Sequence, residues 1–272
     1  MIDPRPRRRL DRWMKATLFA LFVALLLVGC AEYTTVDLDN PAIQKEMIMT
    51  AKLGDAIAQY NLGLMYEQGK GVPQDYKEAV KWYRKSAEQG DADAQCNLGY
   101  MYDQGFGVSE DDKEAVKWYR KAAEQGNAIA QYNLGCEYRD GEGVPQDYKE
   151  AIKWFRKSAE QGYDHAQHNL GLMYYNGEGV PKDYKLAVKW FTKAAEQGLA
   201  DAQSMVGVCH ADGLGVAKNP IEGYAWYNIA IANGDEDAKE WIKEIELSPE
   251  QLIEAQSLST EIYKRIEANK ED

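Results

Sequence analysis

Apolar residues recur at helical spacing in two separate stripes within every 36-residue stretch of the chain between residues 55 and 234. In the first stretch the two stripes consist of Ala58, Leu62, Met65 and Tyr66, followed by Ala79, Val80, Tyr83 and Ala87. Apolar positions three and four residues apart, with polar residues between them, are typical of a helix that buries one face. Each stretch is therefore predicted to form a hairpin of two helices.

The stretches follow one another without insertion, so equivalent residues keep one register along the chain. Two series of identical residues mark this register: Gly63, Gly99, Gly135, Gly171 and Gly207, and Trp82, Trp118, Trp154, Trp190 and Trp226. A fixed period of this length is typical of stacked units that share one continuous core. The chain is predicted to be an all-α solenoid of five 36-residue units, at residues 55–90, 91–126, 127–162, 163–198 and 199–234.

The repeated residues also predict where helices begin and where two helices pack closely. Asp75 and Glu78 have the spacing of a capping box, in which Asp caps the second helix and Glu reaches back to the first N–H group. Gly63 and its equivalents lie inside the first helix, where Gly costs about 0.5–1 kcal/mol relative to Ala. Their recurrence predicts a close approach of the partner helix, and the recurring Trp residues are predicted to pack between helices.

Both ends of the array carry segments suited to covering its core. Residues 41–54 keep the second-helix pattern but lack its Trp, and they are predicted to form an N-terminal capping helix. In residues 235–272, Ser248, Pro249 and Gln251 predict the start of a closing helix. The apolar stripe of this helix consists of Leu252, Ala255, Leu258, Ile262 and Ile266.

The segment "DADAQCNLGYMYDQGFGVSEDDKEAVKWYRKAAEQG", residues 91–126, resembles a Sel1-like repeat, a relative of the tetratricopeptide repeat with a longer connection between its helices. The resemblance covers residues 55–234. It implies a right-handed superhelix of antiparallel helix pairs, and it implies that the first helix of each unit lines the concave surface. Members of the family commonly act as scaffolds for protein complexes.

The first 29 residues have the pattern of a signal peptide, with six basic residues before an apolar run at 16–28. This run is shorter than the roughly 20 residues that span a bilayer. The residues Leu27-Val28-Gly29-Cys30 resemble a bacterial lipobox, which implies cleavage before Cys30, lipidation of its thiol and a short linker at 30–40. Ala31 favours the outer membrane, facing the periplasm, by analogy with bacterial lipoproteins. The alternative is an uncleaved signal anchor.

Charge argues against a nucleic-acid partner. The chain has a net charge of -12, and removal of residues 1–29 leaves 26 basic and 42 acidic residues, a net charge of -16. Such a surface repels phosphate backbones and keeps the array in solution.

Catalytic motifs are missing from the sequence, which contains no Ser-x-x-Lys, G-x-S-x-G, HExxH or EF-hand pattern. His165 and His168 lie three residues apart on one helix, but a third metal ligand is not evident, so neither a metal nor another cofactor is expected. Some disulfide-rich members of the Sel1-like family are described as β-lactamases. The paired cysteines of those proteins are absent from this chain, so it is expected not to be an enzyme.

Three cysteines follow Cys30. Cys209 takes the place of Met65 in the repeat and is predicted to be a buried small apolar residue. Cys96 and Cys136 fall on neighbouring first helices, so a disulfide between them in an oxidising periplasm stays open as an alternative to free thiols.

Several first-helix positions change from unit to unit while their neighbours Ala58, Gln59 and Asn61 recur. A position that packs against the next unit must fit the same neighbour each time, whereas a position facing a groove need not. The residues expected on the inner face are Ile57, Tyr60, Leu64 and Glu67; Asp93, Cys96, Tyr100 and Asp103; Ile129, Tyr132, Cys136 and Arg139; and His165, His168, Leu172 and Tyr175. Tyrosines in a polar surround are common in protein recognition. The alternative is an unconstrained surface.

The sequence thus predicts a membrane-anchored, non-enzymatic adaptor that binds a protein or peptide through the concave face of its repeats. Two alternatives remain: a hydrolase acting on β-lactams or the cell wall, and a surface or secreted virulence factor that binds a host protein.

Overall fold

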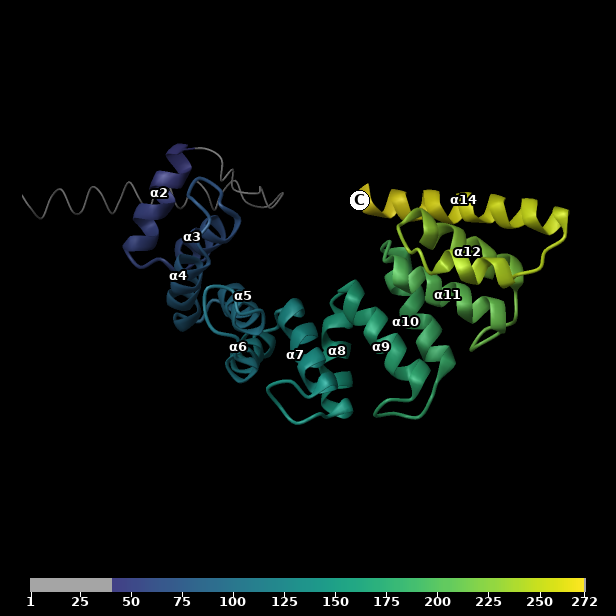
Figure 1. Ribbon diagram of the computed structural model, residues 1–272, viewed down its shortest axis with the longest axis horizontal. Coiled ribbons are helices and arrows are strands. Elements are labelled where there is room, and N and C mark those ends of the chain that lie inside the picture. Colours follow the sequence, from purple (N-terminus) through teal and green to yellow (C-terminus); the bar gives the residue numbers. More distant parts are fainter. Residues whose placement is uncertain (1–40, 272) are drawn as a thin grey trace, which may run out of the picture. The chain divides into compact units, whose positions relative to one another are not determined.

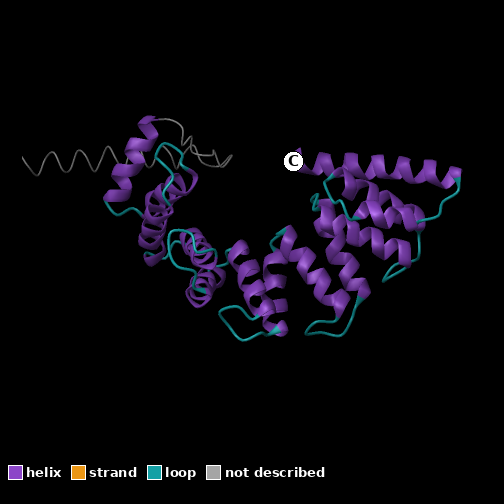
Figure 2. Cartoon of the chain, in the orientation of Figure 1, coloured by secondary structure: helices purple, strands orange, loops and turns teal. Residues whose placement is uncertain are grey.

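The computed structural model describes residues 41–271, and all regular elements in this range are helices (Figures 1 and 2). In chain order they are α2 (Pro41–Lys52), α3 (Ala56–Gln68), α4 (Tyr76–Glu88), α5 (Ala92–Asp103), α6 (Asp112–Glu124), α7 (Ala128–Asp140), α8 (Tyr148–Glu160), α9 (Asp164–Asn176), α10 (Tyr184–Glu196), α11 (Ala200–Asp212), α12 (Pro220–Ala232), α13 (Ala238–Trp241), the 3-10 helix η1 (Ile242–Glu244) and α14 (Pro249–Glu271).

Helices α3 to α12 form five consecutive hairpins, and each odd-numbered helix packs on the even-numbered helix that follows it. The second helix of each hairpin also packs on the first helix of the next hairpin, as α4 does on α5. The predicted all-α solenoid of tetratricopeptide-like helix pairs is therefore confirmed. The signal peptide, the lipidated Cys30 and the linker lie outside the described residues. No helix between 41 and 271 combines the length and the apolar character needed to cross a bilayer.

The recurring mid-helix glycines allow close contact within each hairpin. A Cβ atom at Gly99 would lie 2.6 Å from Cδ1 of the Tyr119 ring, and Gly63 faces Tyr83 in the same way. The ring of Tyr119 is fully buried. The predicted close approach is confirmed, and its cause is an aromatic ring of the second helix lying on the bare backbone of the first.

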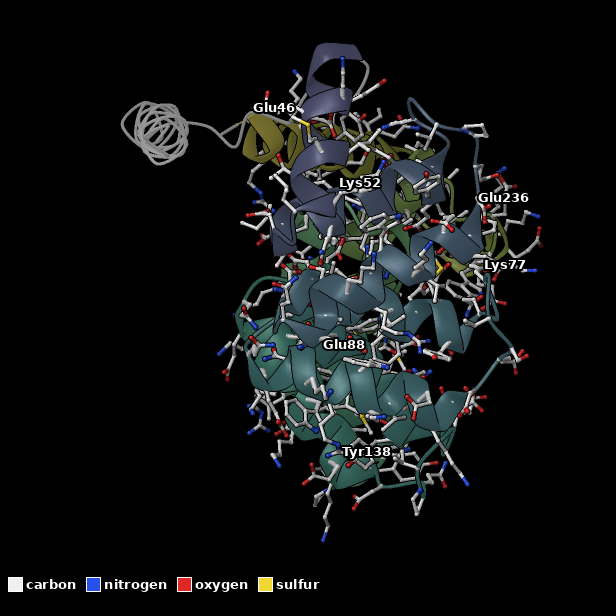
Figure 3. All side chains as sticks on the ribbon, turned by 90° about the vertical axis from the view of Figure 1, so that its left-hand side faces the viewer. Glu46, Lys52, Lys77, Glu88, Tyr138 and Glu236 are labelled. Atoms are coloured by element: carbon white, nitrogen blue, oxygen red, sulfur yellow. The ribbon has the colours of Figure 1, made fainter. Side chains whose placement is uncertain are left out.

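Side chains of the second helices also contact the neighbouring repeats on both sides, Trp118 packing with Tyr83 of the preceding repeat. The indole of Trp118 is only 7% exposed, which confirms its role in packing. Arg120 donates a hydrogen bond from Nη2 to the hydroxyl of Tyr138, 2.7 Å away on α7. Lys77 and Glu88, both labelled in Figure 3, are exposed at opposite ends of α4. The second helices thus divide into a packed side and a charged, solvated side.

A buried glutamine joins each unit to the helix before it. The amide of Gln95 donates a hydrogen bond to the carbonyl of Ala87, 3.0 Å away at the end of α4. Its side-chain oxygen accepts a second bond, of 2.7 Å, from Gln125. The carbonyl of Ala87 also accepts from the N–H of Gly90 at 3.1 Å, so the glutamine adds a second bond, from the next repeat, to a carbonyl at the end of the helix. Gln59, Gln131, Gln167 and Gln203 repeat the contact to the preceding helix.

Of the two hydrogen bonds in the capping box predicted at Asp75, only the one accepted by the Asp side chain forms. Asp75 caps α4, accepting hydrogen bonds from the N–H groups of Lys77 and Glu78 at 2.9 and 3.1 Å. The predicted return bond from Glu78 is wrong, because the Asp75 N–H donates to the carbonyl of Tyr66, 2.9 Å away in the first helix. Glu78 pairs with Lys81 instead, at 3.0 Å.

The closing helix α14 has the complete capping box that the sequence predicts. The N–H of Ser248 donates to Oε1 of Gln251 at 2.9 Å, and the N–H of Gln251 donates to Oγ of Ser248 at 3.3 Å. Helix α14 packs on α12 through its predicted stripe, in which Ala255, Ile262 and Ile266 are buried. The last repeat is therefore covered as expected.

Candidate partner-binding face

The variable positions of the first helices form a surface that we call the first-helix face, consisting of Ile57, Tyr60, Leu64, Glu67, Asp93, Cys96, Tyr100, Asp103, Ile129, Tyr132, Cys136, Arg139, His165, His168, Leu172 and Tyr175. Neighbouring first helices touch directly at this face: Nη1 of Arg139 on α7 donates to Oδ1 of Asn169 on α9 at 2.7 Å. The face is thus continuous at least between the third and fourth repeats.

Five of the predicted residues are exposed, ten are half-buried and one is buried. Ile57, Tyr100 and Ile129 are 63%, 40% and 49% exposed, and Asp93 and His165 are also exposed. Cys96 is only 5% exposed, and burial raises the pKa of its thiol to about 12. The prediction that Cys96 faces a partner is wrong, because its small side chain is buried in the core. The remaining predicted positions are half-buried.

In the first two repeats, the acidic residues of the face hold the core tyrosines. The hydroxyl of Tyr83 donates to Oε2 of Glu67, and the hydroxyl of Tyr119 donates to Oδ2 of Asp103, 3.3 Å away. Burial and the nearby carboxylates raise the pKa of both phenols far above the ordinary value. Glu67 and Asp103 therefore have structural roles besides any contact with a partner.

The third and fourth repeats carry an aromatic cluster on the face. The ring centroids of Tyr132 and Tyr163 lie 5.2 Å apart in an edge-on arrangement, and His165 lies 6.1 and 5.7 Å from them. Asn169 donates to the hydroxyl of Tyr132 at 3.4 Å, which ties the cluster to the contact with Arg139. Such a half-buried cluster with polar edges suits an aromatic hot spot.

A second aromatic group lies in the second repeat, and sequence reasoning missed part of it. Phe106 stacks on Tyr76 with centroids 5.1 Å apart and meets Tyr100 edge-on at 6.0 Å. Phe106 is 36% exposed. The same position of the connection holds Lys70, Glu142, Glu178 and Leu214 in the other repeats, so the repeat register itself marks Phe106 as unusual.

Glu137 is another residue that the sequence analysis did not single out. It occupies the slot of Met65 and Met101, is only 5% exposed, and its Oε2 has no hydrogen-bond partner. Burial, reinforced by acidic neighbours of which Asp103 is the strongest, raises the pKa of Glu137 to about 8. The carboxyl group is therefore largely neutral at physiological pH.

The histidines lie apart from any complete ligand set. Burial lowers the pKa of His168, whose ring lies 5.6 Å from that of Phe191. Nδ1 of His210 lies 2.5 Å from Oε2 of Glu222. Within residues 41–271, no three His, Cys, Asp or Glu side chains are placed to hold a metal ion.

The cysteines in the same range are free thiols, so the disulfide left open above is not formed in this structure. Cys209 is fully buried, as predicted.

Hairpins stacked at a fixed register, with a constant packing side and a variable face, define an α-solenoid of the interaction-scaffold class. The family model described as "Sel1 repeat" matches residues 56–91, 92–127, 128–163, 164–199 and 200–235, and the chain belongs to the Sel1 repeat family. Proteins of this family generally mediate protein–protein interactions as non-enzymatic scaffolds.

Solved structures agree with this assignment. A Sel1 repeat protein from Oxalobacter formigenes is 35% identical, with a TM-score of 0.71 over 80% of this chain and 90% of that one. A protective antigen of uropathogenic Escherichia coli with a Sel1-like repeat fold is 34% identical, with a TM-score of 0.50 over 85% of this chain and 58% of that one.

Among curated proteins, the DAP3-binding cell death enhancer 1 of Rattus norvegicus is 33% identical over 87 residues, 32% of this chain. The chain spans 14% and 17% of the lengths of two curated relatives that it matches. The similarity therefore covers only a small part of each relative.

Proposed function

We propose that this protein is a membrane-anchored, non-enzymatic adaptor that holds a protein or peptide partner on its first-helix face. The observation that carries the proposal is the contrast within each repeat. The second helices of the first four repeats keep nearly one sequence, whereas their first helices present different side chains at several equivalent slots, such as those of Leu64 and Glu67. Exposed Tyr100 and the cluster around Tyr132 supply aromatic anchors of the kind that dominate binding energy at interfaces.

The relatives support partner binding as the general activity. The rat protein, 33% identical over 87 residues, is described by its name as binding DAP3. The net charge of the chain and the acidic groups Asp93 and Asp103 on the face favour a partner surface with basic character.

The anchor is the second part of the proposal. The basic and apolar pattern of residues 1–29 and the lipobox-like Leu27-Val28-Gly29-Cys30 support lipidation at Cys30. Two or more acyl chains would hold the protein stably on a membrane. Ala31 favours the outer membrane, with the repeats in the periplasm. Palmitate labelling tests this part: Cys30→Ala is expected to lose both label and membrane association, and a variant that keeps both would disprove the anchor.

The face is tested by exchanging its tyrosines for the residues that the fifth repeat holds at the same slots. This rule gives the substitutions Tyr60→Ser, Tyr100→Val, Tyr132→Ser and Tyr175→Ala. Each replacement is already compatible with one copy of the fold. Affinity capture from detergent-solubilised membranes, read by mass spectrometry, is expected to lose the partner that the wild type retains.

A matched control changes four exposed lysines of the second helices to Ala: Lys81, Lys117, Lys153 and Lys189. This variant is expected to keep the partner. Circular dichroism on both variants verifies folding. Equal capture by the wild type and a folded tyrosine variant would remove the first-helix face from consideration.

A second candidate is a surface protein that binds a host protein. The similarity to the protective antigen of uropathogenic Escherichia coli favours it, since an antigen must be reached by antibodies. Protease treatment of intact cells separates the two: degradation of the repeats favours the surface protein, and full protection favours the periplasmic adaptor.

A further inference from the structure

The fifth repeat has a half-open cavity where the array meets its C-terminal cover. The cavity has a volume of about 450 Å³ and lies between α11, α12 and the segment at 241–246. Helices α11 and α12 lie side by side at this end of the array (Figure 1). A volume of this size is in the range of small-ligand sites.

The repeat register explains why the cavity is open in this repeat. In the first repeat, Glu67 accepts a hydrogen bond from the hydroxyl of Tyr83. The equivalents in the fifth repeat are Ala211 and Tyr227, both of which line the cavity. Shortening Glu to Ala removes both the acceptor and the bulk that would fill this space. The Tyr227 side chain is only 4% exposed, yet its hydroxyl makes no hydrogen bond to any residue between 41 and 271.

Part of the cavity lining is aromatic and apolar. The rings of Tyr227 and Trp241 have centroids 6.0 Å apart and an angle of 55° between their planes. Trp241 is 37% exposed, a large value for an indole, and Val208 and Ile245 extend the apolar wall. An electron-rich aromatic surface of this kind attracts organic cations.

The charged residues that line the cavity are mostly acidic. They are the carboxylates of Asp212, Glu244 and Glu246 against the single ammonium group of Lys218. None of the four forms an ion pair with another described residue. The pKa of Tyr227 is raised, first by burial of the side chain and next by the negative charge of Asp212, with a smaller contribution from Glu244. The negative potential of these carboxylates therefore extends to the hydroxyl. The cavity thus combines an aromatic wall with an excess of unpaired carboxylates.

We propose that this cavity binds an organic cation with an apolar group, which lies against Trp241 and Tyr227 while the carboxylates of Asp212, Glu244 and Glu246 offset its charge. The shared chemistry is an alkylated ammonium or a guanidinium group. Its source is either a free alkylamine or a Lys or Arg side chain of a bound polypeptide.

Isothermal titration of the full chain in an uncharged detergent tests the proposal. The probes are butyltrimethylammonium, butylammonium and neutral butanol. The two cations are expected to bind saturably, and butanol is expected to bind at least roughly tenfold more weakly, as loss of a desolvated cation–π contact implies. Equal binding of butanol, or no saturable binding of either cation, would overturn the proposal.

Variants that copy the residues at equivalent positions of other repeats make the test specific to this cavity. Ala211→Glu restores the residue of the first repeat, so it should bond to Tyr227, fill the cavity and abolish cation binding. Tyr227→Phe copies Phe155 and Phe191. It should weaken butylammonium, which has N–H donors, and leave butyltrimethylammonium unchanged. A folded Ala211→Glu protein that binds as the wild type does would refute the site.

Charge is tested with Glu244→Gln and Glu246→Gln combined. The matched control is Glu254→Gln with Glu261→Gln, since both are exposed on α14 outside the cavity. Only the first pair is expected to weaken both cations, by roughly tenfold. If both pairs of substitutions weakened binding equally, the cations would be attracted by the net charge of the protein and not by the cavity. That result would overturn the assignment.

A second titration distinguishes the two sources of the cation. It uses a short apolar peptide with one central Arg and the same peptide with Gln. Binding of the Arg peptide at least tenfold tighter than butylammonium would identify a polypeptide side chain, and weaker binding would identify a free amine.

Discussion

The two helices of each repeat obey different rules. Helices α4, α6 and α8 share an Asp N-cap, a buried Trp and a Lys in the last turn, and they differ at few positions. Helices α3, α5 and α7 share most of their packing residues, whereas slots such as those of Leu64 and Glu67 hold a different residue in each of the three. Stacking constrains the side chains of each repeat that contact its two neighbouring repeats. The other side is left free to change.

The third repeat shows how far that freedom extends into the core. Where its neighbours hold Met101 and Met173, it holds Glu137, buried and with one oxygen unpaired. Burying such a carboxyl group is tolerated because it can stay protonated. First helices thus vary even at a packing slot, which no second helix of the first four repeats does to this degree.

Substituting a mid-helix glycine should have the largest effect. Gly99→Leu would force a side chain into the Tyr119 ring, where even a Cβ atom would lie at 2.6 Å. We expect a loss of about 3 kcal/mol or more in the free energy of unfolding, measured by urea denaturation followed by circular dichroism. Tyr100→Leu, which copies Leu64 one position along the helix, is the control and should cost under about 1.5 kcal/mol.

Glu137→Met should stabilise the protein, on the order of 2 kcal/mol at pH 8. Because burial raises the pKa of Glu137 to about 8 in the fold, the wild type is most stable below the unfolded pKa, where this carboxyl group is protonated, and loses stability as pH rises through 8. The like charges that face it come from Asp103, Asp112, Asp140 and Glu142.

The difference between Glu137→Met and wild type should therefore grow from pH 5 to pH 9 in urea titrations. Glu160→Met, at an exposed site, is the control and should show no such trend. A difference that is independent of pH would show that the carboxyl group keeps its ordinary pKa.

Removing one N-cap of a second helix should cost about 1 kcal/mol. Asp111 caps α6 by accepting from the N–H of Glu114 at 3.1 Å. Asp111→Ala is expected to lower the urea midpoint accordingly. The neighbouring Glu110→Ala, at an exposed residue that caps nothing, should leave the midpoint unchanged. Equal midpoints for both variants would contradict the capping role.

Loss of one cation–π contact should have the smallest effect, about 0.5 kcal/mol. Nζ of Lys121 lies 3.9 Å from the centre of the Trp118 ring. Lys121→Ala is compared with Lys113→Ala, which removes an exposed Lys of the same helix with no ring contact. A double-mutant cycle with Trp118→Phe would isolate the interaction energy, and a value near zero would dismiss it.

The sequence predicted what depends on one repeat or on contacts repeated along the chain. The helix stripes, the contact at Gly63, the buried Cys209 and the capping box at Ser248 all belong to this kind. The sequence missed features set by the path of a connection. The N–H of Asp75 is taken by Tyr66 because the connection brings it there, and Phe106 stacks on Tyr76 for the same reason.

The candidate sites follow the same division. The first-helix face could be proposed by comparing repeats, whereas the burial of Cys96 and the bonds of Glu67 and Asp103 to core tyrosines needed the structure. The cavity beside Trp241 could not be proposed, because Ala211 leaves a space only when the segment at 241–246 closes over it. Sequence comparison reveals a missing side chain, but the surrounding packing decides whether a void remains.

The buried glutamines make the array modular in length. Gln95 meets the carbonyl of Ala87, and Gln131 meets that of Ala123. If residues 91–126 were excised, Gln131 would come to lie opposite Ala87 and form the same bond. Duplication or loss of one whole 36-residue repeat therefore preserves this glutamine bond, so the length of the array can change while the bond between neighbouring repeats stays the same.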